Sequence, residues 1–391
     1  MPLKIAVPKE THAGERRVAL IPQVVQDLVK DGREVTVQRG AGVAAGFPDA
    51  EYEARGARLV DDRAQLFASA DVVLQVRALG ANPGSGADDL ALMRSGQVLV
   101  ASCAPLDHPG PLGDAAARGV TVFALELVPR TTRAQSMDVL SSMATLAGYK
   151  AVLLGAGALP RILPMMMTAA GTLAAARCFV LGAGVAGLQA MATAKRLGAV
   201  VEGYDIRPVV KDQVISVGAR FVELALDTAA AEGAGGYAKE QGEDFLRKQR
   251  ELLTGVIAKS DLVITTAAIP GRPSPELVTE DMVKAMQPGS VLIDLAAERG
   301  GNCRLTRAGE TIDAHGVTIM GPLDLPSTVP SDASRMLARN ALAFLRNAYK
   351  KGADALDIAD DIVQGTMAVH AGEVTNARVR ESLGLPPPVS A

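Results

Sequence analysis

The stretch Cys178-Phe-Val-Leu-Gly-Ala-Gly-Val-Ala-Gly187 runs from a short apolar strand through a glycine motif into a helix with an apolar face. In this pattern Gly182 allows a tight turn, and Gly184 lets a pyrophosphate approach the backbone. Gly187 lets the helix pack closely on the strand, and the helix N-terminus supplies N–H donors. We therefore predict that the pyrophosphate of a dinucleotide is bound by Gly182, Gly184, Val185, Ala186 and Gly187.

A second strand, expected at 200–205, ends in the carboxylate Asp205, about 20 residues beyond the motif. A carboxylate there binds the adenosine ribose hydroxyls and repels a 2′-phosphate, so the pattern predicts NAD(H) rather than NADP(H). Ile206 and Arg207 follow directly, and we place both beside the cofactor. Arg207 weakens the predicted preference, since an arginine at this point can accommodate a 2′-phosphate. The alternative for Asp205 is a solvated acid at a strand end.

Outward from this motif, short β-branched runs alternate with alanine-rich helical stretches along most of the chain. This alternation is typical of βαβ units on parallel sheets. The strands that we expect are 4–7, 34–38, 71–76, 98–102, 120–124, 178–181, 200–205, 219–222, 262–266, 291–295 and 317–320. The predicted fold class is α/β, with two doubly wound parallel-sheet (Rossmann-like) domains and a cleft between them.

A polar loop followed by a helix-compatible stretch, over 129–151, marks the expected domain boundary. We predict an N-terminal domain over 1–138 that is completed by the C-terminal segment 328–391, and an NAD(H)-binding domain over 139–327. The C-terminal segment is assigned in this way because 331–351 has helical periodicity and a basic end. A second glycine motif, Gly155-Ala-Gly-Ala158, has no following strand and acid, and predicts a turn or a close helix contact.

The composition excludes several classes of protein. With 391 residues, 48% of them hydrophobic, and a net charge of −3, the chain is globular and has no cation excess for nucleic acid. Its 3 cysteines lack any CxxC pairing and its 4 histidines are scattered, so neither a disulfide framework nor a metal site is predicted. The uncharged run 162–176 is shorter than the ~20 residues of a membrane helix. We expect a soluble, cytoplasmic protein.

A polar cluster lies at the expected domain junction, where ligand clefts form. It comprises Arg130, Arg133, Gln135, Asp138 and Ser141. If the chain becomes helical near Ser136, Asp138 and Ser141 lie one turn apart on one face. Such a cluster can hydrogen-bond a carboxamide and a ribose, or it can form a salt-bridge network that holds the junction. The residues alone leave both possibilities open.

Several motifs resemble one family. They are Arg133-Ala-Gln-Ser-Met-Asp138, Leu146-Ala-Gly-Tyr-Lys150, Pro164-Met-Met-Met-Thr-Ala-Ala-Gly171, Gly184-Val-Ala-Gly-Leu-Gln-Ala190, Gly235-Gly-Tyr-Ala-Lys239 and Thr265-Thr-Ala267. Together they resemble the soluble NAD(H)-binding domain I, or alpha subunit, of the proton-translocating nicotinamide nucleotide transhydrogenases, a family related to the alanine dehydrogenases. The matches extend from Pro8 to about residue 340. Two departures are Thr328, where the family commonly has arginine, and the poorly matching stretch after Asn340.

The resemblance implies roles for particular residues. Arg130, Gln135, Asp138 and Ser141 match the loop that holds the nicotinamide end of NAD(H), and Thr266 and Ala267 match cofactor-binding positions. Tyr237 matches the tyrosine of a mobile lid, although an ordinary loop over 227–239 is the alternative. The resemblance also implies direct hydride transfer from NADH to NADP⁺, with NADP(H) held only by a partner subunit, and no resident metal. It further implies a homodimer, membrane-spanning partner subunits, and a cytoplasmic location peripheral to the inner membrane.

Two alternatives remain open. An alanine dehydrogenase shares the fold and the opening Pro8-Lys-Glu10, but its oxidative deamination moves protons and needs a lysine and a histidine in the cleft. At the matching positions this chain has Gln75, Arg77 and Cys103. Arginine is a poor proton shuttle because it stays charged. A non-catalytic NAD-binding regulatory module is the second alternative.

Overall fold

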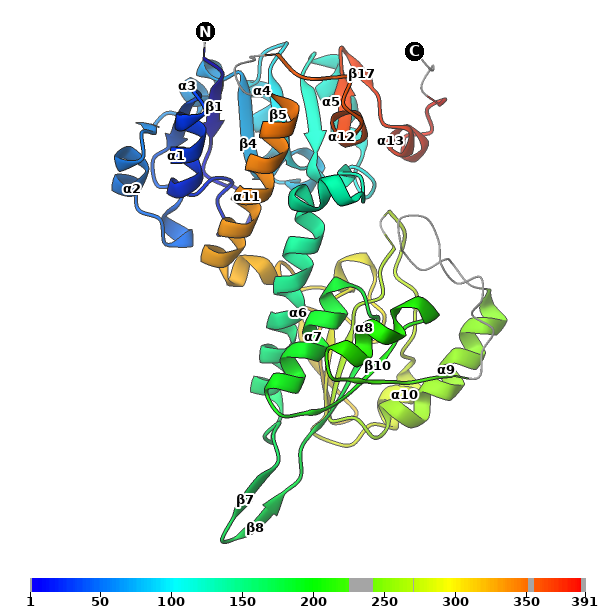
Figure 1. The fold of residues 1–391 in the computed structure, drawn as a ribbon. Coiled ribbons are helices and arrows are strands. Elements are labelled where there is room, and N and C mark those ends of the chain that lie inside the picture. Colours follow the sequence, from blue (N-terminus) through cyan, green and yellow to red (C-terminus); the bar gives the residue numbers. More distant parts are fainter. Residues whose placement is uncertain (1, 225–241, 270, 351–354, 388–391) are drawn as a thin grey trace. The chain divides into compact units, whose positions relative to one another are not determined.

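The computed structural model describes residues 2–224, 242–269, 271–350 and 355–387. The chain divides into two compact units (Figure 1). The first unit comprises Met1–Met143 with Ser327–Ala391, and the second comprises Ala144–Pro326. Each unit is built on its own sheet, so each is described separately.

Within the described residues, the first sheet has eight strands in the order β17-β16-β6-β5-β4-β1-β2-β3. Their bounds are β1 Lys4–Val7, β2 Glu34–Gln38, β3 Arg58–Val60, β4 Val72–Arg77, β5 Val98–Ser102, β6 Thr121–Ala124, β16 Met367–His370 and β17 Glu373–Val374. Strands β1 to β6 are parallel, whereas β16 is antiparallel to β6 and to β17. The two strands of the C-terminal segment, β16 and β17, therefore extend the parallel sheet through antiparallel pairs. The strands expected from the sequence do not include them.

Helices cover both faces of the first sheet, which explains why its inner strands are almost continuously apolar. One face packs against α1 Pro22–Lys30, α2 Asp49–Ala54, α11 Pro330–Ala348 and α12 Asp361–Thr366. The other face packs against α3 Arg63–Ser69, α4 Gly86–Leu92, α5 Gly110–Ala117 and α13 Ala377–Ser382. Phe344 of α11 meets Phe123 of β6 with ring centroids 5.2 Å apart. The helix from the C-terminal segment is thus part of the first core.

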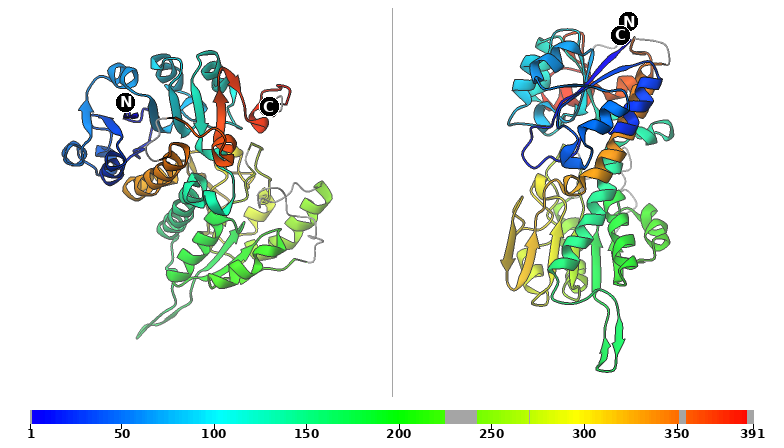
Figure 2. Two further views of the ribbon diagram at one scale, coloured as in Figure 1. Left: turned by 45° about the horizontal axis from the view of Figure 1, so that its top comes forward. Right: turned by 90° about the vertical axis from the view of Figure 1, so that its left-hand side faces the viewer.

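The second sheet has seven strands among the described residues, in the order β11-β10-β9-β12-β13-β15-β14. Their bounds are β9 Arg177–Leu181, β10 Val200–Tyr204, β11 Arg220–Phe221, β12 Leu262–Thr265, β13 Val291–Asp294, β14 Thr311–Ala314 and β15 Val317–Met320. On one face lie α6 Val139–Ala158, α7 Val185–Arg196 and α8 Lys211–Ser216, and on the other lie α9 Glu243–Ile257 and α10 Glu280–Lys284 (Figure 2). All pairs are parallel except β14 with β15.

Helix α6 packs closely against the second sheet through its glycines. A Cβ on Gly155 would lie 2.5 Å from a Leu262 methyl carbon, and one on Gly148 would lie 2.1 Å from the Ala186 carbonyl oxygen. The predicted close helix contact at Gly155 is confirmed. By length and composition α6 could also cross a membrane. That evidence is weak, since Ala151 and Val152 of this helix are fully buried in the second core.

A two-stranded hairpin, β7 Met166–Thr168 with β8 Gly171–Leu173, extends from the second unit (Figure 1). Its side chains are exposed, and Met167 retains 74% of its accessible surface. No strand is predicted here from the sequence, because the run has no two-residue alternation of apolar and polar side chains. Strands β3 and β14 are also missing from the prediction, and both are short edge strands. The predicted α/β class with two sheet-based domains is confirmed.

Candidate functional site

The switch point of the second sheet lies between β9 and β12, because the chain leaves β9 toward β10 on one side and β12 lies on the other. In doubly wound sheets, ligands bind outside the carboxyl ends of the strands at this point. The predicted glycine turn begins here, with the N–H of Gly182 donating to the Tyr204 carbonyl at 2.8 Å. The N–H of Thr266 donates to the Leu181 carbonyl, also at 2.8 Å. The residues after β9, β10 and β12 are therefore brought together.

The three motif glycines are needed for different reasons. Gly182 has φ +101°, and a Cβ there would lie 2.4 Å from Thr266 Oγ1. A Cβ on Gly187 would lie 1.8 Å from the Gly182 carbonyl oxygen, so only glycine lets α7 approach the turn. Gly184 is exposed, and a Cβ there would have no protein atom within 4 Å. The N-terminus of the 12-residue α7 is therefore accessible at Gly184, and helix N–H groups at such a position can bind an anion. Val185 is exposed and Ala186 partly exposed in the first turn of that helix.

Asp205 is buried and held from two sides. Its Oδ2 accepts the Ala183 N–H at 2.7 Å, which ties the carboxylate to the glycine turn. Arg207 donates its backbone N–H and Nε–H to Oδ1, both at 2.9 Å, and Nη2–H to Oδ2 at 2.8 Å. Each carboxylate oxygen thus already accepts two hydrogen bonds. The sequence places Arg207 near the cofactor but gives no sign of this ion pair. Ile206, between them, is partly exposed.

Thr266 and Ala267 follow β12 beside the glycine turn. The Thr266 hydroxyl lies 3.2 Å from the carbonyl oxygens of both Leu181 and Gly182. The Ala267 backbone is bracketed by the buried Asn302, whose Oδ1 accepts its N–H at 3.0 Å and whose Nδ2 donates to its carbonyl at 2.8 Å. Asn302 is not among the predicted residues. The paired hydrogen bonds that it makes across 35 residues leave no signal in a single sequence.

In the first unit, the predicted loop forms η4 Thr132–Met137, and α6 begins directly after it. Asp138 stands at this junction. Its Oδ1 accepts the Ser141 N–H at 2.9 Å, and its Oδ2 accepts the Ser141 hydroxyl at 2.6 Å. This is the arrangement of an N-terminal cap. The helix begins at Val139 rather than near Ser136, so Asp138 precedes the helix and caps it instead of sharing a helical face with Ser141. Arg130 and Gln135 have exposed side chains in the same segment. Tyr237 lies outside the described residues.

The carboxyl edge of the first sheet differs, because the chain's own carboxylates fill it. Glu10, after β1, accepts the N–H groups of Val76 and Arg77 at 2.7 and 3.1 Å. Burial raises the pKa of Glu10 to about 8, against the effect of these hydrogen bonds. The neighbouring Glu15 accepts Nε and Nη2 of Arg17 and Nε of Arg77. Burial opposes its ionisation, but the two guanidinium groups lower the pKa of Glu15 to about 2.

A third internal carboxylate, Glu126, lies at the same edge. Glu126 Oε1 accepts the N–H groups of Cys103 and Ala104, both at 2.8 Å. Its Oε2 is buried without a hydrogen-bond partner among the described residues. Burial raises the pKa of Glu126 to about 7, and burial likewise raises the pKa of the Cys103 thiol.

Three positions at this edge of the first sheet match those where an alanine dehydrogenase needs proton-transferring groups. They are Gln75, Arg77 and Cys103. Gln75 is buried and donates to Asp89 Oδ2 at 2.8 Å. Arg77 is paired with Glu15 at 3.0 Å, and Cys103 is fully buried. The side chains at these positions are therefore engaged within the protein, and they include neither lysine nor histidine.

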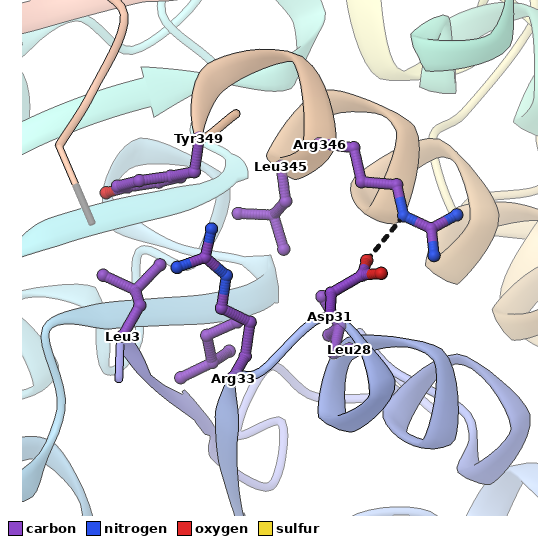
Figure 3. Close-up of a pocket in the computed structure, with 8 residues that line it drawn as sticks. Leu3, Leu28, Asp31, Arg33, Leu345, Arg346 and Tyr349 are labelled. Atoms are coloured by element: carbon purple, nitrogen blue, oxygen red, sulfur yellow. Dashed lines mark hydrogen bonds and ion pairs between the residues drawn. The ribbon is translucent and has the colours of Figure 1, made fainter. Parts of the chain in front are cut away.

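A cavity of about 320 Å³ lies at the opposite edge of the first sheet (Figure 3). It is lined by Leu3, Ile5, Leu28, Asp31, Arg33, Leu345, Arg346 and Tyr349. An ion pair between Asp31 and Arg346, at 2.7 Å, stands at its side. The lining includes none of the predicted site residues, and it has no glycine turn. The cavity is therefore separate from the candidate dinucleotide site.

Comparisons with known proteins agree with this geometry. The family model for the alanine dehydrogenase/PNT N-terminal domain matches residues 6–147, and the model for the C-terminal domain matches residues 151–377. The chain is 48% identical over 380 residues to an NAD(P) transhydrogenase subunit alpha polypeptide of Rhodospirillum rubrum, covering 96% of this chain and 98% of the relative. It is 31% identical over 390 residues to the alanine dehydrogenase of Halomonas elongata, covering 98% and 97%. The crystal structure of a transhydrogenase from Sinorhizobium meliloti superposes with a TM-score of 0.84 at 44% identity, covering 95% and 99%.

Proposed function

Because the chain belongs to the alanine dehydrogenase/PNT family, we propose that it is the NAD(H)-binding component of a proton-translocating, Re/Si-specific NAD(P) transhydrogenase. In this proposal it presents NADH for direct hydride transfer to NADP⁺, which a partner subunit holds, and it is active only with that subunit. The observation that carries the proposal is the turn at Gly184. This turn lies at the switch point of the second sheet. A Cβ on Gly184 would have no protein atom within 4 Å, and Asp205 accepts the N–H of the neighbouring Ala183.

The residues of the second unit would hold the adenosine and pyrophosphate portions of the dinucleotide. Gly182, Gly184, Val185, Ala186 and Gly187 would bind the pyrophosphate through backbone N–H groups and the helix N-terminus. Asp205, with Ile206 and Arg207 directly after it, would bind the adenosine end. Thr266 and Ala267 are proposed as further cofactor-binding residues, and Tyr237 as the tyrosine of a lid, as the family resemblance implies. Since Arg207 already holds the carboxylate, the ribose hydroxyls would bind to Asp205 by displacing part of that ion pair.

The loop of the first unit would hold the nicotinamide end. Gln135 and Arg130 present exposed amide and guanidinium groups that can hydrogen-bond a carboxamide, and Asp138 with Ser141 fixes the start of α6. The bound dinucleotide supplies the hydride, so no substrate N–H or O–H proton has to move. These residues then need only to orient the ring and exclude water. The side chains of Gln75, Arg77 and Cys103, none of them lysine or histidine, disfavour the alanine dehydrogenase alternative.

We further propose that the protein is a homodimer that associates with NADP(H)-binding and membrane-spanning subunits, and that it lies in the cytoplasm, peripheral to the inner membrane. The exposed hairpin β7–β8 supports pairing with a second copy. A two-stranded hairpin is only marginally stable alone, and this one exposes Met165, Met167 and Leu173. A dimer by light scattering that dissociates in Met167→Asp would agree with this. A wild-type monomer would contradict it.

The decisive experiment mixes the purified chain with an NADP(H)-binding transhydrogenase domain and follows hydride exchange with an NAD analogue. The proposal predicts exchange in the mixture, none with either component alone, and no turnover of alanine. Gln135→Asn should slow exchange about tenfold while the NADH dissociation constant changes less than about threefold, because the shorter side chain alters ring placement. Exchange at the wild-type rate would remove Gln135 from the site. NADH binding without exchange would favour a regulatory module.

A further inference from the structure

The loop that carries Gln135 is held by the C-terminal segment of the first unit. We propose that Asn340 of α11 and Asp360, which precedes α12, are positioning residues that fix η4 for hydride transfer. This inference rests on the proposed function and extends it to a region of the chain that the motifs left unassigned. Neither residue is proposed to touch the dinucleotide. Both hold the backbone from which Gln135 and Asp138 project.

The inner anchor is Asn340. It is buried, and its Nδ2 donates to the Ser136 carbonyl at 2.8 Å, directly beside Gln135. Its Oδ1 is also buried and has no hydrogen-bond partner among the described residues. The bond to Ser136 is the side-chain hydrogen bond that Asn340 makes among the described residues. Its direct effect is to fix the position of the Ser136 carbonyl beside Gln135.

The outer anchor is the ion pair of Arg133 with Asp360. Arg133 Nη1 donates to Asp360 Oδ2 at 2.7 Å, and its Nη2 contacts Asp361. Asp360 Oδ1 accepts Asn347 Nδ2 of α11 at 2.9 Å and the N–H of Ile362 in α12 at the same distance. The bond from Arg133 holds the pKa of the Asp360 carboxyl well below its usual range. One carboxylate thus ties η4 to α11 and α12 of the C-terminal segment.

Next to these anchors the loop inserts two apolar side chains, Ala134 and Met137, into the first core, where they join Leu337 and Ala338 of α11. The backbone at the exposed Gln135 is therefore held by hydrogen bonds at Arg133 and Ser136 and by the packing of Ala134 and Met137 in the core. Hydride transfer depends steeply on ring placement, and a shift of about 1 Å can cost on the order of 100-fold in rate. Binding affinity, which is spread over the whole dinucleotide, changes less. Releasing either anchor should therefore affect rate more than affinity.

The test uses the full chain with the NADP(H)-binding domain and compares three variants. Asn340→Leu removes the bond to Ser136 together with the unpaired oxygen, and Arg133→Met removes the outer ion pair from a half-exposed site. The matched control is Asn82→Leu. Asn82 is also buried in the first unit and also has an unpaired Oδ1, but its Nδ2 donates to Thr11. Thermal unfolding and the NADH dissociation constant are measured beside the single-turnover exchange rate.

We expect Asn340→Leu and Arg133→Met each to lower the exchange rate about tenfold, with the NADH dissociation constant within about threefold of wild type. The Asn82→Leu control should exchange at the wild-type rate. If the wild type exchanges but both anchor variants match the control, the positioning role is refuted and the proposed function stands. A parallel loss of affinity and thermal stability that accounts for the slower rate would also refute it. If the wild type shows no exchange, the proposed function fails, and this inference fails with it.

Discussion

The two sheets have the same strand order around their switch points. The carboxyl edge is open in the second sheet, whereas the chain's own carboxylates occupy it in the first. In the second sheet, the chain turns through Gly182 and leaves open space in front of Gly184. In the first sheet, Glu10 accepts two successive N–H groups at the end of β4, and Glu126 accepts two more directly after β5. In the first sheet, internal carboxylates therefore accept the strand-end N–H groups that could otherwise bind an anionic ligand.

This difference shows that topology offers a place for a ligand, while local sequence decides whether the place stays free. A glycine turn keeps side chains out and lets a phosphate reach the backbone. A glutamate at the equivalent edge supplies a resident acceptor and, when ionised, repels a second anion. The first unit can then serve as a rigid support for η4, and the second unit provides the dinucleotide turn. The following substitutions test each half of this comparison.

The largest effect is expected from Gly187→Ala. The added Cβ would lie 1.8 Å from the Gly182 carbonyl oxygen, which is backbone and cannot move alone. We expect the free energy of unfolding to fall by about 3 kcal/mol and NADH binding to be lost. Chemical denaturation and fluorescence titration with NADH measure the two effects. Wild-type stability would show that α7 does not need this close approach.

Gly184→Ala separates binding from folding. A Cβ at this position meets no protein atom within 4 Å, and the backbone φ of −75° suits any residue. We expect wild-type thermal stability together with a roughly 10- to 100-fold weaker NADH affinity, which corresponds to about 1.4–2.7 kcal/mol. Isothermal titration calorimetry provides the measurement. Unchanged affinity would mean that the pyrophosphate does not approach Gly184, and the second sheet would no longer be the open one.

Asp205→Asn should weaken NADH binding about tenfold, since a neutral amide is a poorer acceptor for the ribose hydroxyls. It should also narrow the difference between NADH and NADPH, because the charge that repels a 2′-phosphate is gone. Arg207→Ala is the matched variant, since it removes the ion pair but keeps the carboxylate. That variant should retain NADH binding and its preference over NADPH. If instead Arg207→Ala lost the preference for NADH over NADPH and Asp205→Asn kept it, Arg207 would be the residue that discriminates between the two cofactors.

The smallest effect on NADH binding is expected at the filled edge, where the prediction concerns stability instead. The pKa of Glu10 is raised to about 8 by burial, so the folded chain keeps a proton that the unfolded chain has already lost above its ordinary pKa of 4.5. The folded state then binds more protons between these values, and stability must fall as pH rises from about 4.5 to 8. In Glu10→Gln this part of the fall is absent, so the difference in unfolding free energy between the variant and wild type should shrink by up to about 4 kcal/mol between about pH 5 and pH 8.5.

Urea denaturation at several pH values provides this measurement, with Asp88→Asn, an exposed acid in α4, as the control for altered net charge. The control should follow the wild-type pH dependence. If Glu10→Gln follows it too, Glu10 is already ionised at neutral pH, and the filled edge then holds a charged carboxylate.

Much of this organisation could be predicted from local sequence, because glycine turns and buried parallel strands have strong local signals. The motif at Gly182 to Gly187 and the strand expected at 200–205 correctly placed β9, the glycine turn, α7 and β10. Helical spacing placed Asp138 and Ser141 one turn apart, but it did not predict that Asp138 caps a helix beginning at Val139.

What escaped prediction depends on contacts between distant residues. The hydrogen bond from Asn340 to Ser136 joins residues that are 204 positions apart. The antiparallel strand β16 is defined by its pairing with β6. Short edge strands such as β3 have too few residues to show a period. None of these features has a local pattern from which it can be read.

The most direct test of the central claim is a crystal structure of the chain with NADH. We predict density for one dinucleotide per chain, with its pyrophosphate in front of Gly184 and its adenosine ribose at Asp205, and none at the Glu10 edge of the first sheet. A dinucleotide bound among Glu10, Arg17 and Arg77, or an empty turn at Gly184 under saturating NADH, would contradict this assignment of the open and filled edges.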